Sequence, residues 1–200
     1  MSLVVGLTGG IATGKSTISE MFKSKEIPVI DSDMIAREVV DINKPAYLKL
    51  IKEFSSEILL CTGHINRKKL SKIIFADEKK REKLNLIVHP EVRKKVIDEI
   101  RKYHTLGNNL LVLDVPLLYE SKFDDLCDFV VVVFTDEATQ CERLMKRDNL
   151  SKEEAKKRIE AQMSLRDKIK IADFKIDNSL SILETHKQFE MLLKKLNYRI

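Results

Sequence analysis

VVGLTGGIATGKST, residues 4–17, is the stretch that decides the fold of this chain. It overlaps a short apolar run, residues 3–7, which is bounded by glycine and predicts a buried β-strand. The pattern Gly9-x-x-x-x-Gly14-Lys15-Ser16 comes next, and apolar residues then recur at helical spacing at Ile18, Met21 and Phe22. Strand, glycine-rich loop and helix in this order predict a phosphate-binding loop.

The residue types of this loop match the chemistry of phosphate binding. Glycines let the backbone approach an anion closely, and successive N–H groups can then form an anion nest at the start of a helix. Lys15 supplies a mobile positive charge, and the Ser16 hydroxyl can ligate Mg²⁺. The alternative is a glycine-rich turn without a ligand. Four of the six glycines lie between Gly6 and Gly14, which favours the phosphate-binding loop.

Composition narrows the class of protein. With 200 residues, of which 44% are hydrophobic, the chain can form one compact domain or one core with inserted lobes. The net charge of +5 suits a polyanionic small molecule, and without a basic stripe interleaved with aromatics we expect no nucleic acid. Three distant cysteines predict reduced thiols in a cytosolic protein. No apolar run is long enough to predict a membrane span.

Further along the chain, strands alternate with helical segments, which predicts an α/β fold. Four more strands are expected at residues 27–30, 110–113, 129–134 and 174–176. Residues 45–103 carry helical periodicity and no strong strand, so they predict an inserted helical lobe. Four helices are expected there, the last of them beginning at Pro90. A final amphipathic helix is expected at residues 182–196, with Leu183 and Phe189 in its apolar stripe.

Carboxylates follow two of the expected strands. Asp31 and Asp33 can cap the next helix, but the carboxyl end of a strand is also where α/β sheets bind ligands, and a carboxylate there could accept a proton from a hydroxyl. Asp114 ends another strand and either holds Mg²⁺ through water or starts an ordinary turn. The residues alone leave both pairs of alternatives open.

Two short polar helices are expected after residue 136. Arg143 and Arg147 stand four apart and share a helix face, as do Arg158 and Gln162, and Ser151-x-x-Glu154 predicts a capping box. These helices fit either a mobile lid that brings guanidinium groups over a transferring phosphate or a solvated helix pair.

Together these segments resemble the dephospho-coenzyme A kinase family over essentially the whole chain. The segments are GLTGGIATGKST at 6–17, DSDMIAR at 31–37, INRKKLSKIIF at 65–75, LIVHPEVR at 86–93, DVPLLYE at 114–120, RLMKRDNLSKEEAKKRI at 143–159 and ADFKIDN at 172–178. The resemblance implies a P-loop fold similar to nucleoside monophosphate kinases, with a five-stranded parallel sheet flanked by helices. It implies one domain with a core at 1–33, 108–136 and 172–200, an acceptor lobe at 34–107 and a lid at 137–171.

The resemblance also implies a reaction and a set of site residues. The γ-phosphoryl group of ATP would pass, with Mg²⁺, to the 3′-hydroxyl of dephospho-CoA in a cytoplasmic enzyme, for which a monomer is expected. The implied catalytic residues are Lys15, Asp33 and Arg143, with Asp33 deprotonating the hydroxyl, and the implied metal ligands are Ser16 and Asp114. The implied ATP contacts are Gly10, Ala12, Thr13, Gly14, Lys15, Ser16, Thr17, Arg143, Arg147 and Asn178. The implied acceptor contacts are Thr8, Asp33, His89, Arg93, Leu117, Leu118 and Tyr119.

The chain departs from the family pattern at a few positions, and three other functions compete. Leu180 and the segment 164–166 replace a glycine and a proline-containing stretch, and Ser55 and Ser71 stand where glycine is common. A kinase for another acceptor is disfavoured by segments 31–37 and 86–93. A GTP switch would need D-x-x-G and N-K-x-D motifs, which the sequence lacks. A non-catalytic nucleotide-binding module would have no reason to combine Asp33 with the two lid arginines.

Overall fold

The computed structural model describes residues 2–196 and divides them into two compact units. Of the described residues, the larger unit comprises 2–30 and 102–196, and the smaller comprises 31–101. The expected lobe boundaries were 34 and 107, and the expected lid falls inside the larger unit.

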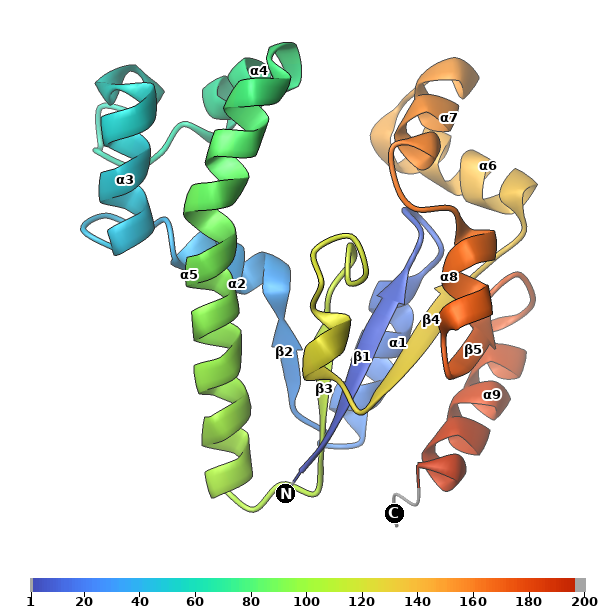
Figure 1. Ribbon diagram of the computed structural model, residues 1–200. Helices are drawn as coiled ribbons and strands as arrows, with labels where there is room; N and C mark the ends of the chain where they lie inside the picture. Colours follow the sequence, from blue (N-terminus) through green and yellow to red (C-terminus); the bar gives the residue numbers. More distant parts are fainter. Residues whose placement is uncertain (1, 197–200) are drawn as a thin grey trace. The chain divides into compact units, whose positions relative to one another are not determined.

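The core of the larger unit is a parallel sheet in the order β2-β3-β1-β4-β5 (Figure 1). Its strands are β1 (Leu3–Gly9), β2 (Val29–Asp31), β3 (Leu110–Asp114), β4 (Phe129–Phe134) and β5 (Phe174–Asp177). The central strand β1 pairs in parallel with β3 from Leu3↔Leu110 to Leu7↔Asp114, and with β4 from Val5↔Phe129 to Gly9↔Val133. All five predicted strands are present, so the predicted α/β class is confirmed.

Helices cover this sheet because its strands are apolar on both faces. The helices of the unit are α1 (Lys15–Ser24), α6 (Glu137–Asp148), α7 (Lys152–Glu160), α8 (Leu165–Ile171) and α9 (Ile182–Lys195), with a 3₁₀ turn, η2 (Asp124–Leu126). Side chains of α1 and α9 form one core cluster with alternate residues of β1, β3, β4 and β5. In that cluster Phe22 of α1 meets Phe189 of α9 edge to face, with ring centroids 4.8 Å apart.

The smaller unit is helical apart from one isolated bridge between Leu59 and Ile65. It contains α2 (Ser32–Glu38), α3 (Pro45–Phe54), η1 (Ser56–Ile58), α4 (Arg67–Ala76) and most of α5 (Glu78–Thr105). Its own core gathers around the buried residues Tyr47, Leu50, Ile58, Ile65 and Leu70. Among the described residues, no helix has both the length and the apolarity to cross a membrane.

The expectation of a helix beginning at Pro90 is wrong, because α5 runs without interruption from Glu78 to Thr105. A proline inside a helix loses one backbone hydrogen bond and crowds the preceding turn. Apolar side chains on both sides of the proline are nevertheless packed: Ile87 and Val88 contact the core of the smaller unit, and Val92 and Val96 are buried. Burial of both halves offsets the local cost, so the helix continues.

We expect the edge-to-face pair of Phe22 and Phe189 to contribute strongly to stability. Phe189→Ala should lower the free energy of unfolding by about 3–5 kcal/mol, because it leaves a cavity where the side chain is 1% exposed. Urea denaturation measures this. Leu183→Ala is the matched control on the same helix: Leu183 was expected in the apolar stripe but is 65% exposed, so its removal should cost less than about 0.5 kcal/mol. Equal losses in the two variants would contradict this account of the core.

Candidate functional site

The phosphate-binding loop joins β1 to α1 and turns through left-handed backbone at two residues. Ala12 has a φ of 62° and Gly14 a φ of 89°, and Gly14 stands at the N-cap position of α1. In the described chain no side chain caps this helix end, so its first N–H groups can point to an anion. A Cβ atom on Gly14 would lie 2.0 Å from Asn178 Nδ2, so the position excludes any larger residue.

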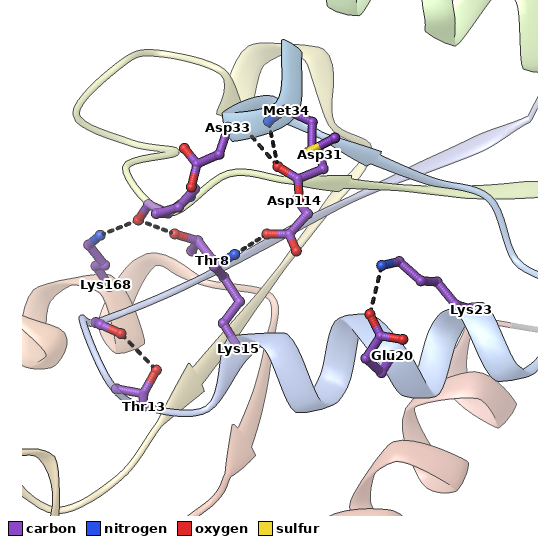
Figure 2. A network of polar contacts seen from close by, with 12 residues as sticks. Thr8, Thr13, Lys15, Glu20, Lys23, Asp31, Asp33, Met34, Asp114 and Lys168 are labelled. Atoms are coloured by element: carbon purple, nitrogen blue, oxygen red, sulfur yellow. Dashed lines mark hydrogen bonds and ion pairs between the residues drawn. The ribbon is translucent and has the colours of Figure 1, made fainter. Parts of the chain in front are cut away.

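Lys15 and Asp114 form an ion pair beside this loop (Figure 2). Lys15 is the first residue of α1, and Asp114 is the last residue of β3, which pairs with β1. The side chain of Asp114 is 7% exposed and that of Lys15 is 19% exposed, so the pair is largely shielded from water. Two residues that the sequence marked separately, ninety-nine positions apart, are thus brought together.

Three side-chain amides hold the phosphate-binding loop from outside. Gln140 Nε2 of α6 donates to the Ile11 carbonyl at 2.9 Å, and the Ile11 N–H donates to Gln162 Oε1 at 2.9 Å. Asn178 Nδ2, just after β5, donates to the Thr13 carbonyl at 2.9 Å. Sequence reasoning did not identify Gln140, and it noted Gln162 only as a helix-face neighbour. Nothing in local spacing marks contacts between residues more than 120 positions apart.

Asn178 is engaged at both ends of its amide. Its Oδ1 accepts from the Thr185 hydroxyl at 3.0 Å, and the residue is 8% exposed. Its backbone carbonyl accepts from Arg143 Nη1 at 3.1 Å. The Asn178 side chain therefore supports the phosphate-binding loop, and its contact with ATP stays a prediction.

The two polar helices after residue 136 pack against the same loop. Cys141, Leu144 and Ala155 form a small core between α6 and α7, and Ile11 and Ala12 of the loop pack on it. The predicted capping box is confirmed, since Ser151 and Glu154 each bond the other's backbone N–H. The helix pair is therefore attached to the loop by packing as well as by Gln140 and Gln162.

The arginines of this helix pair have different partners. Arg147 donates twice to Asp148, at 2.8 and 3.2 Å, and Arg158 Nη1 donates to the same carboxylate at 2.7 Å. The hydrogen bonds raise the pKa of Arg147 and lower the pKa of Asp148. Arg143 lies instead at the Asn178 carbonyl, next to the phosphate-binding loop. Of the two expected phosphate contacts, Arg143 is the one held against the loop.

Four expected acceptor contacts lie in or beside β1 and β3, and most have packing roles. Thr8 is fully buried and donates to the Pro116 carbonyl at 3.0 Å (Figure 2). Leu118 is also fully buried, at contact distance from Gly6, where an added Cβ would lie 2.9 Å from Leu118 Cδ1. The Tyr119 hydroxyl is buried without a hydrogen-bond partner among the described residues, and burial raises the pKa of Tyr119 to about 12. Leu117 is 42% exposed, and all four acceptor contacts stay predictions.

In the smaller unit, Asp31 and Asp33 have separate roles. Asp31 Oδ1 caps α2 by accepting from the N–H groups of Asp33 at 2.8 Å and Met34 at 3.1 Å (Figure 2). The Asp33 side chain is exposed in the first turn of that helix. The capping interpretation therefore belongs to Asp31, and the exposed Asp33 side chain does not cap α2.

His89 and Arg93 lie one turn apart on α5. A shallow groove on this helix is lined by Glu82, Asn85, Leu86, His89 and Pro90. Partial burial lowers the pKa of His89, which favours the neutral imidazole, and a neutral imidazole can donate one hydrogen bond and accept another.

Comparison with known proteins identifies a family for this chain. A family model described as dephospho-CoA kinase matches residues 3–184. The dephospho-CoA kinase of Bacillus cereus is 50% identical over 197 residues, 98% of each chain, and that of Bacillus licheniformis is 51% identical over 193 residues, 96% of each chain. The solved structure of dephospho-CoA kinase from Campylobacter jejuni is 29% identical with a TM-score of 0.76, covering 98% of each chain.

We expect Asn178→Asp to disrupt the phosphate-binding loop, because a carboxylate would face the Thr13 carbonyl in place of a donor. The free energy of unfolding at pH 7 should fall by about 1–3 kcal/mol, measured by urea denaturation. A carboxyl buried against a carbonyl has a raised pKa, so the defect should shrink as the pH falls toward about 4 and be smallest below it, where the carboxyl is protonated and can donate again. Asn43→Asp, at an exposed loop residue, is the control for the same change in charge. A loss no larger than that of the control would contradict the role given to Asn178.

Proposed function

This chain belongs to the dephospho-CoA kinase family, and we propose that its phosphate-binding loop holds ATP while the γ-phosphoryl group passes to the 3′-hydroxyl of dephospho-CoA. The protein is thus a kinase of coenzyme A biosynthesis. The observation that carries the residue assignment is the convergence of the loop, Lys15 and Asp114 at the carboxyl ends of β1 and β3. This is the edge where parallel sheets bind nucleotides.

In the proposed reaction, the 3′-hydroxyl oxygen attacks the γ-phosphorus and the bond to the β,γ-bridging oxygen breaks, so that ADP leaves. The loop N–H groups and Lys15 stabilise the charge that spreads over the phosphoryl oxygens. Asp33 accepts the proton of the attacking hydroxyl. Its exposure, and the fact that Asp31 rather than Asp33 caps α2, support this role.

The residues beside the loop also fit Mg²⁺. Ser16 offers an exposed hydroxyl at the start of α1, and Asp114 offers a carboxylate at the end of β3, both of them the oxygen donors that Mg²⁺ prefers. Among residues 2–196 no group of three or more His, Cys, Asp or Glu side chains could hold a metal, which agrees with an ion that takes its other ligands from phosphates and water. When bound, Mg²⁺ would neutralise charge on the phosphate oxygens.

We assign Arg143 to the phosphates and Arg147 to a contact made only after it leaves Asp148. Arg143 is already held at the Asn178 carbonyl beside the loop, whereas Arg147 is paired with Asp148. We keep Leu117, His89 and Arg93 as contacts to the acceptor. Thr8, Leu118 and Tyr119 instead support the site by packing. We also propose a cytosolic location, which is supported by the free state of all three cysteines.

A coupled ADP-release assay tests the function directly. Purified protein with ATP and Mg²⁺ should release ADP with dephospho-CoA and not with AMP or pantetheine. Faster turnover of AMP would show that the acceptor assignment is wrong. ADP release without any acceptor would mean an ATPase.

Asp33→Asn should lower kcat by about 10²–10⁴-fold, because the amide cannot accept the hydroxyl proton. ATP binding, measured by calorimetry, should not change, since Asp33 is assigned to the acceptor. Asp41→Asn, an exposed carboxylate beyond the end of α2, is the control and should keep full activity. An Asp33→Asn enzyme with normal kcat would exclude Asp33 as the base.

A further inference from the structure

Lys168 of α8 is a fully buried lysine with two oxygen partners. Its side chain is 0% exposed, and Nζ lies 2.9 Å from Glu120 Oε1 and 3.2 Å from the Pro116 carbonyl. Removing an ammonium group from water is costly unless it is paired and hydrogen-bonded. Both partners belong to one short segment, residues 114–120. The buried lysine therefore holds that segment in place.

The two partners of Lys168 are themselves shared with other elements. The Pro116 carbonyl also accepts from Thr8 Oγ1 of β1 at 3.0 Å, and Figure 2 shows Thr8 and Lys168 directed at the same acceptor. Glu120 Oε1 also accepts from the Met163 N–H at 3.0 Å. Met163 follows α7 and comes directly after Gln162, whose amide holds Ile11 of the phosphate-binding loop. Lys168 therefore completes a connection from the joint between α7 and α8, residues 161–164, to the segment after β3.

This segment carries one residue assigned to the phosphate side of the proposed site and one assigned to the acceptor. Its first residue, Asp114, pairs with Lys15, and its exposed Leu117 is the remaining acceptor contact of the segment. A shift of residues 115–120 would displace Leu117 while leaving the phosphate-binding loop held by its three amides. The two effects can therefore be separated by measurement.

We propose that Lys168 is a positioning residue for the acceptor: it fixes residues 115–120 against the joint between α7 and α8 so that dephospho-CoA meets a preformed surface. This rests on the proposed function. The alternative is a purely structural lysine, whose loss would lower stability without a selective effect on one substrate.

Lys168→Met tests the proposal, because methionine is unbranched and of similar length and preserves the packing of the stem. The Pro116 carbonyl keeps its bond from Thr8, and Glu120 is partly exposed and can be hydrated. We expect KM for dephospho-CoA to rise about tenfold, the loss expected for a hydrogen bond to a charged group. Kd for ATP should be unchanged, and amide hydrogen exchange in residues 115–123 should become faster.

Lys170→Met is the matched control. Lys170 lies on the same helix and also pairs with an acid, Asp167 at 3.0 Å, but its side chain is 61% exposed. Lys170→Met should leave KM for dephospho-CoA, Kd for ATP and hydrogen exchange in residues 115–123 as in the unchanged protein. Glu120→Gln is the second variant, used also if Lys168→Met does not fold. It keeps the acceptor for Met163 and removes only the charge, so KM for dephospho-CoA should rise by a smaller factor, again with faster exchange in residues 115–123.

The outcomes are distinguishable. Normal KM for dephospho-CoA and normal exchange in both variants would overturn the proposal, as would an equal weakening of ATP binding and acceptor binding. If the unchanged protein does not phosphorylate dephospho-CoA, the proposed function fails. The exchange of residues 115–123 in Lys168→Met and Glu120→Gln would then still show whether Lys168 holds the segment.

Discussion

The hydrogen bonds that side-chain amides make to the phosphate-binding loop are the constraint on which the rest of the larger unit depends. A loop that turns its N–H groups toward an anion turns carbonyls outward, and buried carbonyls need donors. Gln140 and Asn178 supply those donors, and Gln162 accepts the N–H of Ile11. The three amides come from α6, from the joint after α7 and from the end of β5, so these elements must be in place for the loop to hold its shape.

The same arrangement joins the phosphate-binding loop to the segments around it. Ile11 and Ala12 pack on the small core of α6 and α7, so a movement of that helix pair would also move the phosphate-binding loop. Asp114 reaches Lys15 from β3, and the segment beginning at Asp114 is fixed through Pro116 and Glu120 by Lys168. The loop and the α6–α7 pair are tightly packed, so they have little free volume to absorb a displacement of one against the other.

The sequence predicted the strands, the phosphate-binding loop and the capping box, because each is encoded within a few neighbouring residues. It could not predict the roles of Gln140, Gln162 and Asn178, whose partners lie more than 120 residues away. It also could not separate buried from exposed members of an apolar run: Leu118 and Leu117 are adjacent, yet one is buried and the other is 42% exposed. The prediction of a helix beginning at Pro90 failed for a related reason. The packing of α5 with distant residues outweighs the helix-breaking tendency of the proline.

The central position of β1 has a consequence for how the chain is made. Both partners of this strand come late, since Leu3 pairs with Leu110 and Val5 with Phe129. At about 5–20 residues per second on the ribosome, β1 waits about 5–20 s before β3 exists to pair with it. The smaller unit lies between them in the chain and can form its own core in that interval. The insert can therefore form before the centre of the sheet, while β1 and the phosphate-binding stretch still lack their strand partners.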